Sequence, residues 1–454
     1  MSSEDIFNAS PLYRAAEGYV KNAPARFHTP GHKGNSAAPC GFLGDALRFD
    51  LTELPETDSL YEAAGAIMEA ERLAASAFKM KETLMSAGGA TLCIQAMLRL
   101  VSQSGGRRII MARNIHRSAV NGVALLGLEP VWVWPRGFED SALPGAIAAQ
   151  DVERALLKAG GAAAVYITSP DYYGVISDVA AIAAVCRSHG VPLLVDNAHG
   201  AHLLCIDGGA LHPAHLGAAM TSDSAHKTLP VMTGGAWLQI AEIASRDQAK
   251  AAMALFGSTS PSYPVMLSLD LARAWMERYG ERAYGQLKDR VDDINRLCEK
   301  LGFIRPKAVF DPVRITIDTA SAGLSGFDAA AFLRSRGISP EMCDDRHIVL
   351  LPSPFNGGDD FERLEKALLS LPLGGGTEAR PTEQLTPIQI LTPREALDAY
   401  GETVGIDDAA HRIAAECACP CPPGVPMVMP GELISENLAK ALKNYGVKCI
   451  KVVK

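Results

Sequence analysis

The chain has 454 residues, of which 48% are hydrophobic and 21% are charged. That length exceeds what one hydrophobic core usually fills, and the composition is typical of a globular protein, so we expect two or more domains. The formal charge of −8 argues against nucleic acid as a partner, and the sequence has no run of 18 apolar residues and no secretion signal, so we expect a cytoplasmic protein that does not enter the membrane.

The first predicted domain is an α/β domain that we place at residues 61–300, after a lead-in segment at residues 1–60. Short apolar runs alternate in it with helical patterns. We expect buried strands at 107–112, 129–134, 163–168, 191–196 and 234–240, and helices that include 91–102, 152–159 and 179–188. Because parallel strands need long crossovers and two covered faces, this order predicts a mainly parallel sheet, whose ligands bind beyond the carboxyl ends of the strands.

The rest of the chain predicts smaller units. A long helical stretch at residues 264–300 leads toward an α+β segment at 301–370, with strands at 313–318 and 347–352. Residues 371–389 are rich in Gly, Pro and Thr, which is typical of a linker. A last domain would then occupy residues 390–454, with a helix that begins near Arg394.

Ten cysteines are spread along the chain, and three of them form a C-x-C-x-C run at Cys417, Cys419 and Cys421. A structural zinc site normally uses C-x-x-C pairs or nearby histidines, and neither accompanies this run. We therefore expect reduced thiols and no metal.

Two motifs lie in the first half of the large domain. Gly88 and Gly89 lie in a Gly-rich turn that leads into a helix, where free N–H groups and the helix dipole attract phosphate, although they could form only a turn. His116, in NIHRS after the strand at 107–112, could stack on a flat cofactor ring or simply bond to the backbone at a helix start.

Two further motifs suggest one cofactor, pyridoxal 5′-phosphate (PLP). Asp196 ends the strand at 191–196, and a carboxylate there could keep a pyridine nitrogen protonated, or could cap a helix. In TSDSAHKTL (221–229), Ser222 and Ser224 offer hydroxyls to a phosphate and Lys227 offers an amine that can form an imine. Apolar residues follow Lys227 at once, which favours a desolvated lysine over a solvated one.

The motifs SAGGAT (86–91), NIHRS (114–118), VDNAHGAH (195–202) and SDSAHK (222–227), in this order, resemble the PLP-dependent Orn/Lys/Arg decarboxylase family. FHTPGHKG (27–34), DLTELPETDSL (50–60) and the tail from LTPREAL through PPGVP and PGE extend the likeness over nearly the whole chain. The resemblance implies the short form without a wing domain. It also implies a fold type I, aminotransferase-like large domain with a mainly parallel seven-stranded sheet, and a small α+β C-terminal domain.

The resemblance also implies roles for individual residues. Lys227 would be the Schiff-base lysine, Asp196 the partner of the pyridine nitrogen and His116 the residue stacked on the ring. The phosphate would be held at Gly89, Ala90, Thr91, Ser222, Ser224 and His226, with Ala198 and His199 beside the cofactor. A segment that reaches the phosphate of a neighbouring subunit in a dimer would correspond to Ser258, Thr259 and Ser260.

The implied activity is decarboxylation of arginine, lysine or ornithine to the corresponding polyamine-pathway amine. Lys227 or His226 would return a proton to Cα, and a distal anion for the basic substrate would come from Glu341, Asp344 or Asp345. The sequence departs from the family pattern at Ala90, where a hydroxyl residue is common, and at Cys421, where an aromatic residue is usual. Ala90 would then contribute only its backbone N–H.

Two other functions stay open. An aminotransferase or carbon–sulfur lyase of the same fold would need an arginine for the substrate carboxylate, for which Arg26, Arg314 and Arg346 are available. A non-catalytic homologue is less consistent with the presence of Lys227, Asp196 and His116 together. The sequence contains no motif that distinguishes arginine, lysine and ornithine as substrates, because one methylene changes the binding free energy by only about 1–3 kcal/mol.

Overall fold

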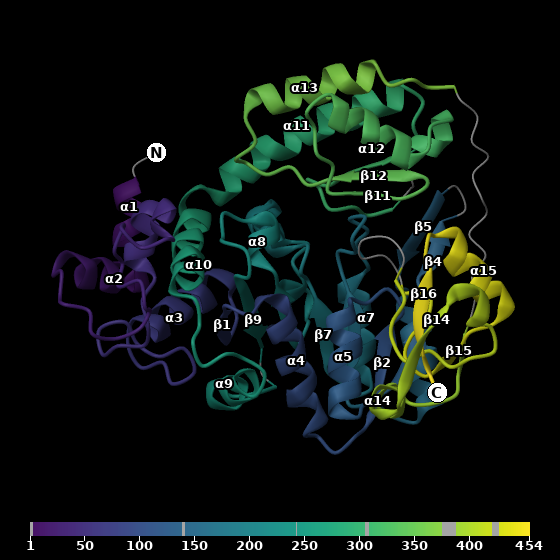
Figure 1. Cartoon of the computed structure of the whole chain (residues 1–454), viewed down its shortest axis with the longest axis horizontal. Helices are drawn as coiled ribbons and strands as arrows, with labels where there is room; N and C mark the ends of the chain where they lie inside the picture. The colour runs from purple at the N-terminus through teal and green to yellow at the C-terminus, as the bar shows by residue number, and fades with distance from the viewer. Residues whose placement is uncertain (1–2, 139–140, 242, 305–307, 375–386, 420–425) are drawn as a thin grey trace. The chain divides into compact units, whose positions relative to one another are not determined.

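The computed structural model describes the chain except for residues 1–2, 139–140, 242, 305–307, 375–386 and 420–425 (Figure 1). The chain divides into two compact units. The first consists of Met1–Ser104 and Pro192–Arg282, and the second of Gly105–Val191 and Ala283–Lys454. The domain boundaries expected near residues 300, 371 and 390 stay predictions, and much of the expected linker lies outside the described residues.

The main sheet has seven strands in the order β1-β9-β8-β7-β6-β2-β3. The first unit contributes β1 (Glu82–Ser86), β9 (Ala236–Ile240), β8 (Met220–Asp223) and β7 (Leu193–Asp196), and the second contributes β6 (Val165–Thr168), β2 (Arg108–Ala112) and β3 (Glu129–Val133). β9 runs antiparallel to both of its neighbours, whereas β7 and β8 are parallel, as are β2 and its two neighbours. The predicted α/β fold with a mainly parallel seven-stranded sheet is confirmed.

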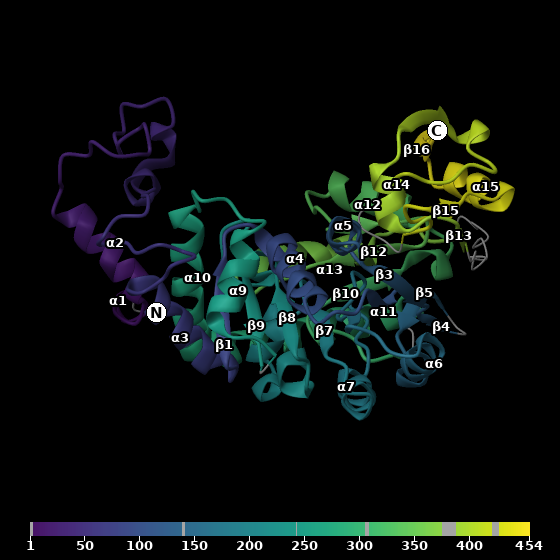
Figure 2. The same cartoon turned by 90° about the horizontal axis from the view of Figure 1, so that it is seen from below.

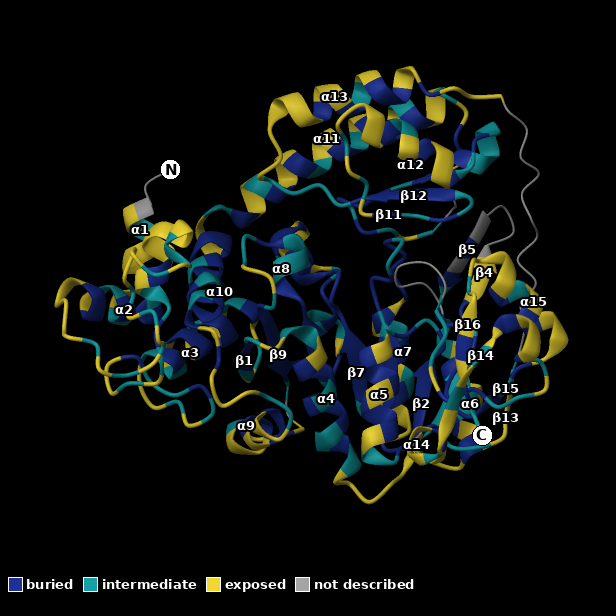
Figure 3. Ribbon diagram, viewed as in Figure 1, coloured by how far each residue is buried: buried dark blue, intermediate teal, exposed yellow. Residues whose placement is uncertain are grey.

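Burial explains why four of these strands, β2, β6, β7 and β9, could be predicted from apolar runs, whereas β3 is only partly buried. Every residue of β7 and β9 is buried, and Figure 3 shows both strands in dark blue. A strand that is covered on both faces lacks the alternation of a half-exposed strand. β8 was not predicted, because its sequence MTSD is mostly polar although all four residues are buried.

The helices of the first unit cover these strands. α3 (Ala66–Phe78) packs against β1, and α4 (Gly89–Ser102) packs against β8, β9 and α9 (Arg246–Ala254). α10 (Tyr263–Trp275) packs against α3 and α2 (Pro11–Lys21), which follows α1 (Ser3–Asn8) (Figure 1 and Figure 2). The expected single helix at 264–300 is α10, a π-helical segment (Met276–Gly280) and α11 (Glu281–Lys300).

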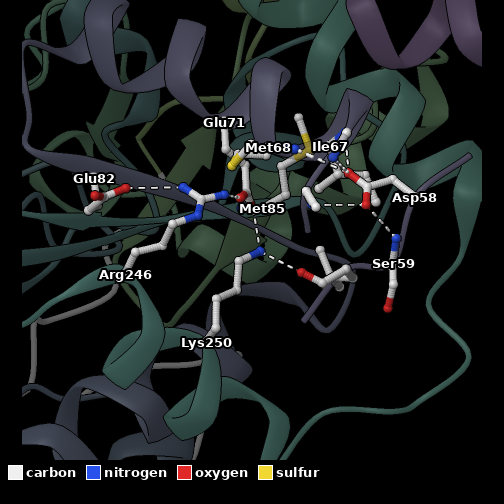
Figure 4. Close-up of polar contacts among 12 residues, drawn as sticks. Asp58, Ser59, Ile67, Met68, Glu71, Glu82, Met85, Arg246 and Lys250 are labelled. Atoms are coloured by element: carbon white, nitrogen blue, oxygen red, sulfur yellow. Dashed lines mark hydrogen bonds and ion pairs between the residues drawn. The ribbon is translucent and has the colours of Figure 1, made fainter. Parts of the chain in front are cut away.

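A buried ion cluster joins three elements of the first unit (Figure 4). The Glu71 carboxylate on α3 is fully buried; it forms ion pairs with Arg246 and with Lys250 Nζ, which lies 2.6 Å away, and it accepts the backbone N–H of Met85 on β1. Lys250 Nζ also donates to the Leu60 carbonyl at 2.6 Å. Burial lowers the pKa of Lys250, and the Glu71 charge opposes that shift. The cluster therefore anchors the lead-in segment to the helices beside β1.

Besides its part of the main sheet, the described residues of the second unit form one three-stranded sheet and three two-stranded pairs. β10 (Ile315–Asp318), β12 (His347–Leu350) and β11 (Met342–Cys343) form an antiparallel sheet that accompanies α11, α12 (Gly326–Ser335) and α13 (Gly358–Leu369). β14 (Gly401–Gly405) pairs with β16 (Cys449–Val453) near α15 (Glu436–Asn444), and β13 (Ile388–Gln389) pairs with β15 (Glu432–Leu433).

The remaining elements of the second unit are α5 (Arg117–Leu126), α6 (Ala149–Ala159), α7 (Val179–Ser188), α14 (Pro393–Asp398) and the hairpin of β4 (Arg136–Phe138) with β5 (Ser141–Ala146). α14 begins one residue before the expected Arg394. Among the residues that the structure describes, no helix combines the length and the apolar character that a membrane span requires.

Candidate active site

The ends of β7 and β8 bring two of the predicted residues together. Asp196 is the last residue of β7 and pairs in register with Ser222 of β8, and both side chains are buried. Asn197 N donates to the Ser222 carbonyl at 3.0 Å, and Asp196 Oδ1 accepts the Ala198 backbone N–H at 3.1 Å. Asp196 is therefore a buried carboxylate at the carboxyl end of a parallel strand.

Lys227 lies on the short helix α8 (Ala225–Thr228), which follows β8 directly. Its Nζ is 2.8 Å from His199 Nε2, and its backbone N–H donates to the Ser224 carbonyl at 3.0 Å. Lys227 is partly buried and His199 is buried. His199 lies three residues after Asp196, and its imidazole contacts the Lys227 amine. A lysine amine held in this way has the chemistry of an imine-forming lysine.

His226 precedes Lys227 and is anchored on α8. Its Nδ1 lies 3.3 Å from both Ser224 Oγ and the Gly235 carbonyl. Burial lowers the pKa of His226; the hydrogen bond to Gly235 opposes this shift, and the Lys227 charge adds to it. The imidazole is therefore neutral at pH 7, with the Nδ1 proton directed to the carbonyl.

The beginning of α4 offers a place for an anion. Gly89 adopts a φ of +67°, a left-handed conformation that favours glycine, and its N–H donates to the Gly234 carbonyl at 2.8 Å. Ser222 Oγ donates to the Ala90 carbonyl at 3.3 Å, which ties the helix start to β8. Thr91 is exposed and Ala90 is partly exposed, so the positive end of this 14-residue helix is accessible to an anion.

These groups fit pyridoxal phosphate. The buried Asp196 carboxylate suits a pyridine nitrogen, the Lys227 amine suits an aldehyde, and the start of α4 with Ser222 suits a phosphate. All of them belong to the first unit, as do Ala198 and His199. Ser258, Thr259 and Ser260 are also in this unit and are exposed, and their role stays a prediction.

His116 belongs to the second unit, where it is the N-cap of α5. Its Nδ1 accepts the Ser118 backbone N–H at 3.2 Å and lies 2.8 Å from Ser118 Oγ. This is the helix-start contact that the sequence left open, and the residue is partly exposed. Stacking of His116 on a cofactor ring stays a prediction.

The three predicted distal anions differ in their surroundings within the second unit. Glu341 is exposed, and its Oε1 accepts the Tyr172 hydroxyl at 2.5 Å. Asp344 is buried and accepts hydrogen bonds from Tyr173 Oη at 2.8 Å and from the backbone of Arg346 and His347. Burial alone would raise the pKa of Asp344, but the hydrogen bond and charge of His347 hold it below the ordinary value.

Asp345 completes this group, and burial and the Asp344 charge raise its pKa. Glu341 thus presents its carboxylate to solvent, whereas the Asp344 carboxylate is held by contacts within the protein.

The arginines that an aminotransferase would need have other partners. Arg314 is buried and donates to the Tyr172 carbonyl at 2.9 Å, and Arg346 donates to Asp318 at 2.7 Å. Arg26 donates to the Arg48 carbonyl at 2.9 Å. These contacts hold loops together.

Sequence reasoning missed the buried Asp223, which lies between Ser222 and Ser224. A charged residue inside a short buried strand was the signal, and β8 was not recognised as a strand. Among the described residues, no group of three or more His, Cys, Asp or Glu side chains is placed to hold a metal; Cys421 lies outside those residues.

Comparison with known proteins identifies relatives over nearly the full length. Residues 10–301 match the family model for the Orn/Lys/Arg decarboxylase major domain, and residues 378–446 match the model for its C-terminal domain. An arginine decarboxylase of Bacillus subtilis (strain 168) is 31% identical, over 96% of this chain and 93% of that protein. An arginine decarboxylase of Halalkalibacterium halodurans is 32% identical over the same shares of the two chains.

Solved structures share the fold at lower identity. The lysine decarboxylase of Francisella novicida superposes with a TM-score of 0.83 at 18% identity, covering 98% of this chain and 81% of that one. Lysine decarboxylase A from Pseudomonas aeruginosa gives a TM-score of 0.83 at 19% identity, covering 99% and 81%.

Proposed function

The chain belongs to the Orn/Lys/Arg decarboxylase family, and we propose that it is a PLP-dependent carboxy-lyase that converts a basic amino acid to its amine and carbon dioxide. One observation carries the proposal. Lys227 Nζ contacts His199, three residues after Asp196, and Asp196 pairs in register with Ser222, whose hydroxyl reaches the start of α4. Arginine is the first substrate to test, because the relatives at 31% and 32% identity are named arginine decarboxylases.

The cofactor would be held by four groups of this chain. When bound, PLP supplies an electron sink for the charge that develops at the substrate Cα. Lys227 would be its covalent anchor, Asp196 would keep the pyridine nitrogen protonated, and the N–H groups of Ala90 and Thr91 with Ser224 would hold the phosphate. The His199 imidazole, 2.8 Å from Lys227 Nζ, would lie beside the lysine amine whenever that amine is free of the cofactor.

Loss of carbon dioxide leaves Cα in need of a proton. His226 is neutral at pH 7 and directs its Nδ1 proton to Gly235, so it is a poor acid. Lys227 Nζ, in contact with His199 Nε2 at 2.8 Å, can carry a proton and exchange it with the imidazole. We assign the proton return to Lys227, with His199 as its partner.

The distal cation of the substrate would be recognised by Glu341. Its carboxylate is exposed and is oriented by the Tyr172 hydroxyl. An oriented carboxylate accepts charge-assisted hydrogen bonds from a guanidinium or an ammonium group. Asp344, whose oxygens are taken by Tyr173, Arg346 and His347, is a weaker choice.

A homodimer or larger homo-oligomer in the cytoplasm completes the proposal. Ser258, Thr259 and Ser260 are exposed on the loop between α9 and α10, as a segment that serves a second subunit would be. Light scattering of the holoenzyme should give at least twice the mass of 48.2 kDa that one chain has. A monomer with full activity would contradict shared active sites.

The test of function is carbon dioxide release by PLP-loaded protein with arginine, lysine and ornithine in parallel, with amines identified by mass spectrometry. A decarboxylase forms one amine and one carbon dioxide without a keto-acid acceptor. Formation of a keto acid that depends on an acceptor, with no carbon dioxide, would replace the proposal by the aminotransferase alternative.

A further inference from the structure

A fully buried polar network lies behind the site in the first unit. Its members share an exposure of 0%: Thr83, Asn197, His212, Thr221, Asp223 and Gln239. Asp223 is at the centre. Its Oδ1 accepts from Asn197 Nδ2 at 2.5 Å and its Oδ2 from Gln239 Nε2 at 2.8 Å, while Thr221 Oγ1 lies 3.4 Å from Oδ2. The carboxylate is thus held entirely by protein donors.

His212 adds a fourth partner. Its Nδ1 accepts the Ala214 backbone N–H at 3.3 Å, and its Nε2 lies 3.1 Å from Asn197 Nδ2 and 3.5 Å from Asp223 Oδ2. The Phe78 ring packs against both His212 and Trp237, with centroids 5.5 and 5.2 Å apart. An apolar wall therefore shields the network, and a carboxylate shielded in this way must have its hydrogen bonds supplied by neighbouring side chains.

The network touches both chain segments that present the predicted cofactor residues. Asn197 directly follows Asp196, and Asp223 is four residues before Lys227. Successive side chains of a strand point to opposite faces, so the Asn197–Asp223 pair lies on the face opposite to Asp196 and Ser222. One side-chain hydrogen bond therefore joins the end of β7 to the end of β8 directly behind the site.

Packing of β7 against β8 would not by itself require a buried polar network. Apolar residues could join two buried strands without desolvating a carboxylate, and buried polar groups hold a directional geometry that apolar contacts do not impose. The segments after β7 and β8 lack regular strand pairing, so a directional tie there fixes how Asp196 and the start of α8 face each other. Asp223 and Asp196 are also close enough to act on one common group: both help to raise the pKa of the buried Cys93 thiol to about 12, a shift that burial mainly sets.

We propose that Asp223 is a positioning residue: through Asn197 it sets the placement of Asp196 relative to Lys227, and its buried negative charge favours the protonated cofactor. The inference rests on the proposed function, because it assigns a role toward the PLP site. Asp223 touches neither cofactor nor substrate and acts only through its neighbours.

The test compares four forms of the full-length holoenzyme: wild type, Asp223→Asn, the exchange variant Asn197→Asp with Asp223→Asn, and Thr83→Val. Asp223→Asn keeps the shape and removes the charge. The exchange variant restores a carboxylate–amide pair at the same place. Thr83→Val is the matched control, because it removes the hydrogen bond from Thr83 Oγ1 to Gln239 Oε1 at the far side of the network. Each form is measured for kcat, KM, thermal midpoint and the pH titration of the absorbance band of bound cofactor.

For Asp223→Asn we expect kcat to fall at least about tenfold with little change in KM, because small displacements of reacting groups cost that much or more. The titration midpoint of the cofactor band should move to lower pH, because a negative charge near the protonated cofactor is gone. The exchange variant should recover kcat to within about threefold of wild type. Thr83→Val should lower only the thermal midpoint.

The inference is overturned if Asp223→Asn keeps the wild-type titration midpoint and kcat and loses only thermal stability, as the control does. Should Asp223→Asn fail to fold, the exchange variant decides: recovered kcat supports positioning, and a folded exchange variant with at least tenfold lower kcat contradicts it. Failure of the proposed function is distinguishable, because wild type itself would then bind no PLP or release no carbon dioxide.

Discussion

Lys227 Nζ and His199 Nε2 are 2.8 Å apart, and this contact links α8 to the segment that follows β7. His199 lies three residues after Asp196, so the amine and the buried carboxylate are presented by neighbouring segments. The imidazole is buried, which limits its motion and keeps the amine in place. The pair therefore combines the lysine that we propose as the cofactor anchor with a group that can exchange a proton with it.

Replacement of His199 by Gln should separate proton transfer from cofactor binding. The variant keeps a polar side chain but lacks the imidazole, so we expect the cofactor band to persist while kcat falls about 10²-fold, within the range of general acid–base effects. The pH profile of kcat should change as well. Equal loss of cofactor and activity would instead mean that His199 only supports the fold.

Replacement of Glu341 by Gln should weaken binding of the basic substrate. A hydrogen bond to a charged group contributes about 1.5–3 kcal/mol, so KM should rise about 10- to 100-fold with a smaller change in kcat. Tyr172→Phe, which removes the hydroxyl that orients Glu341, should raise KM less. Glu362→Gln on α13 is the matched control, because its carboxylate is 62% exposed and pairs only with Lys366 at 3.8 Å among the described contacts. An unchanged KM in Glu341→Gln would show that Glu341 does not bind the substrate.

Replacement of Glu71 by Gln should destabilise the protein. The change leaves Lys250 buried at 5% exposure without its charge partner, and breaking a buried pair from one side costs about 3–5 kcal/mol. Glu17→Gln, which breaks the exposed pair with Lys21, should cost about 0–1 kcal/mol. Denaturant unfolding measures both; a Glu71 effect as small as that of Glu17 would mean that the cluster does not anchor the lead-in segment.

Asp171 should make stability depend on pH. It is buried after β6, with its Oδ1 accepting the Val175 N–H at 2.8 Å, and burial raises its pKa to about 7. The folded protein therefore binds a proton that the unfolded chain has lost between about pH 4 and pH 7. The contribution of Asp171 to stability is full below that window and is lost as the pH rises through it.

The matching variant is Asp171→Asn, in which this titration is absent. The difference in unfolding free energy between wild type and variant should fall by about 1.4 kcal/mol per pH unit across the window. A constant difference from pH 4 to pH 8 would show that Asp171 is ionised in the fold.

The large domain was predictable because its strands are covered on both faces. The run at 191–196 is apolar until Asp196, and the structure places β7 at Leu193–Asp196. β8 was not predicted because its sequence is mostly polar. Its buried Asp223 accepts hydrogen bonds from Asn197 and Gln239, which are distant in the sequence. The expected helix at 264–300 is interrupted by a π-helical segment at Met276–Gly280. This segment has no Pro and no pair of Gly residues from which the interruption could be predicted.

The site was predictable only in part. Asp196 and Lys227 were proposed as cofactor residues from their residue types and from the apolar runs beside them. The contact of Lys227 with His199 depends on how two loops meet, which residue spacing does not give. Glu341 and Asp344 are both acidic residues near β11, and only the structure shows that Asp344 is used by Tyr173 and His347.

The most direct measurement of the central claim compares wild type with Lys227→Ala after loading with PLP, using arginine labelled at its carboxyl carbon. We predict that wild type shows the absorbance of lysine-bound cofactor and releases labelled carbon dioxide with one amine per turnover, and that Lys227→Ala loses both, while Lys366→Ala, at an exposed lysine, loses neither. Persistence of the cofactor band and of carbon dioxide release in Lys227→Ala would contradict the account.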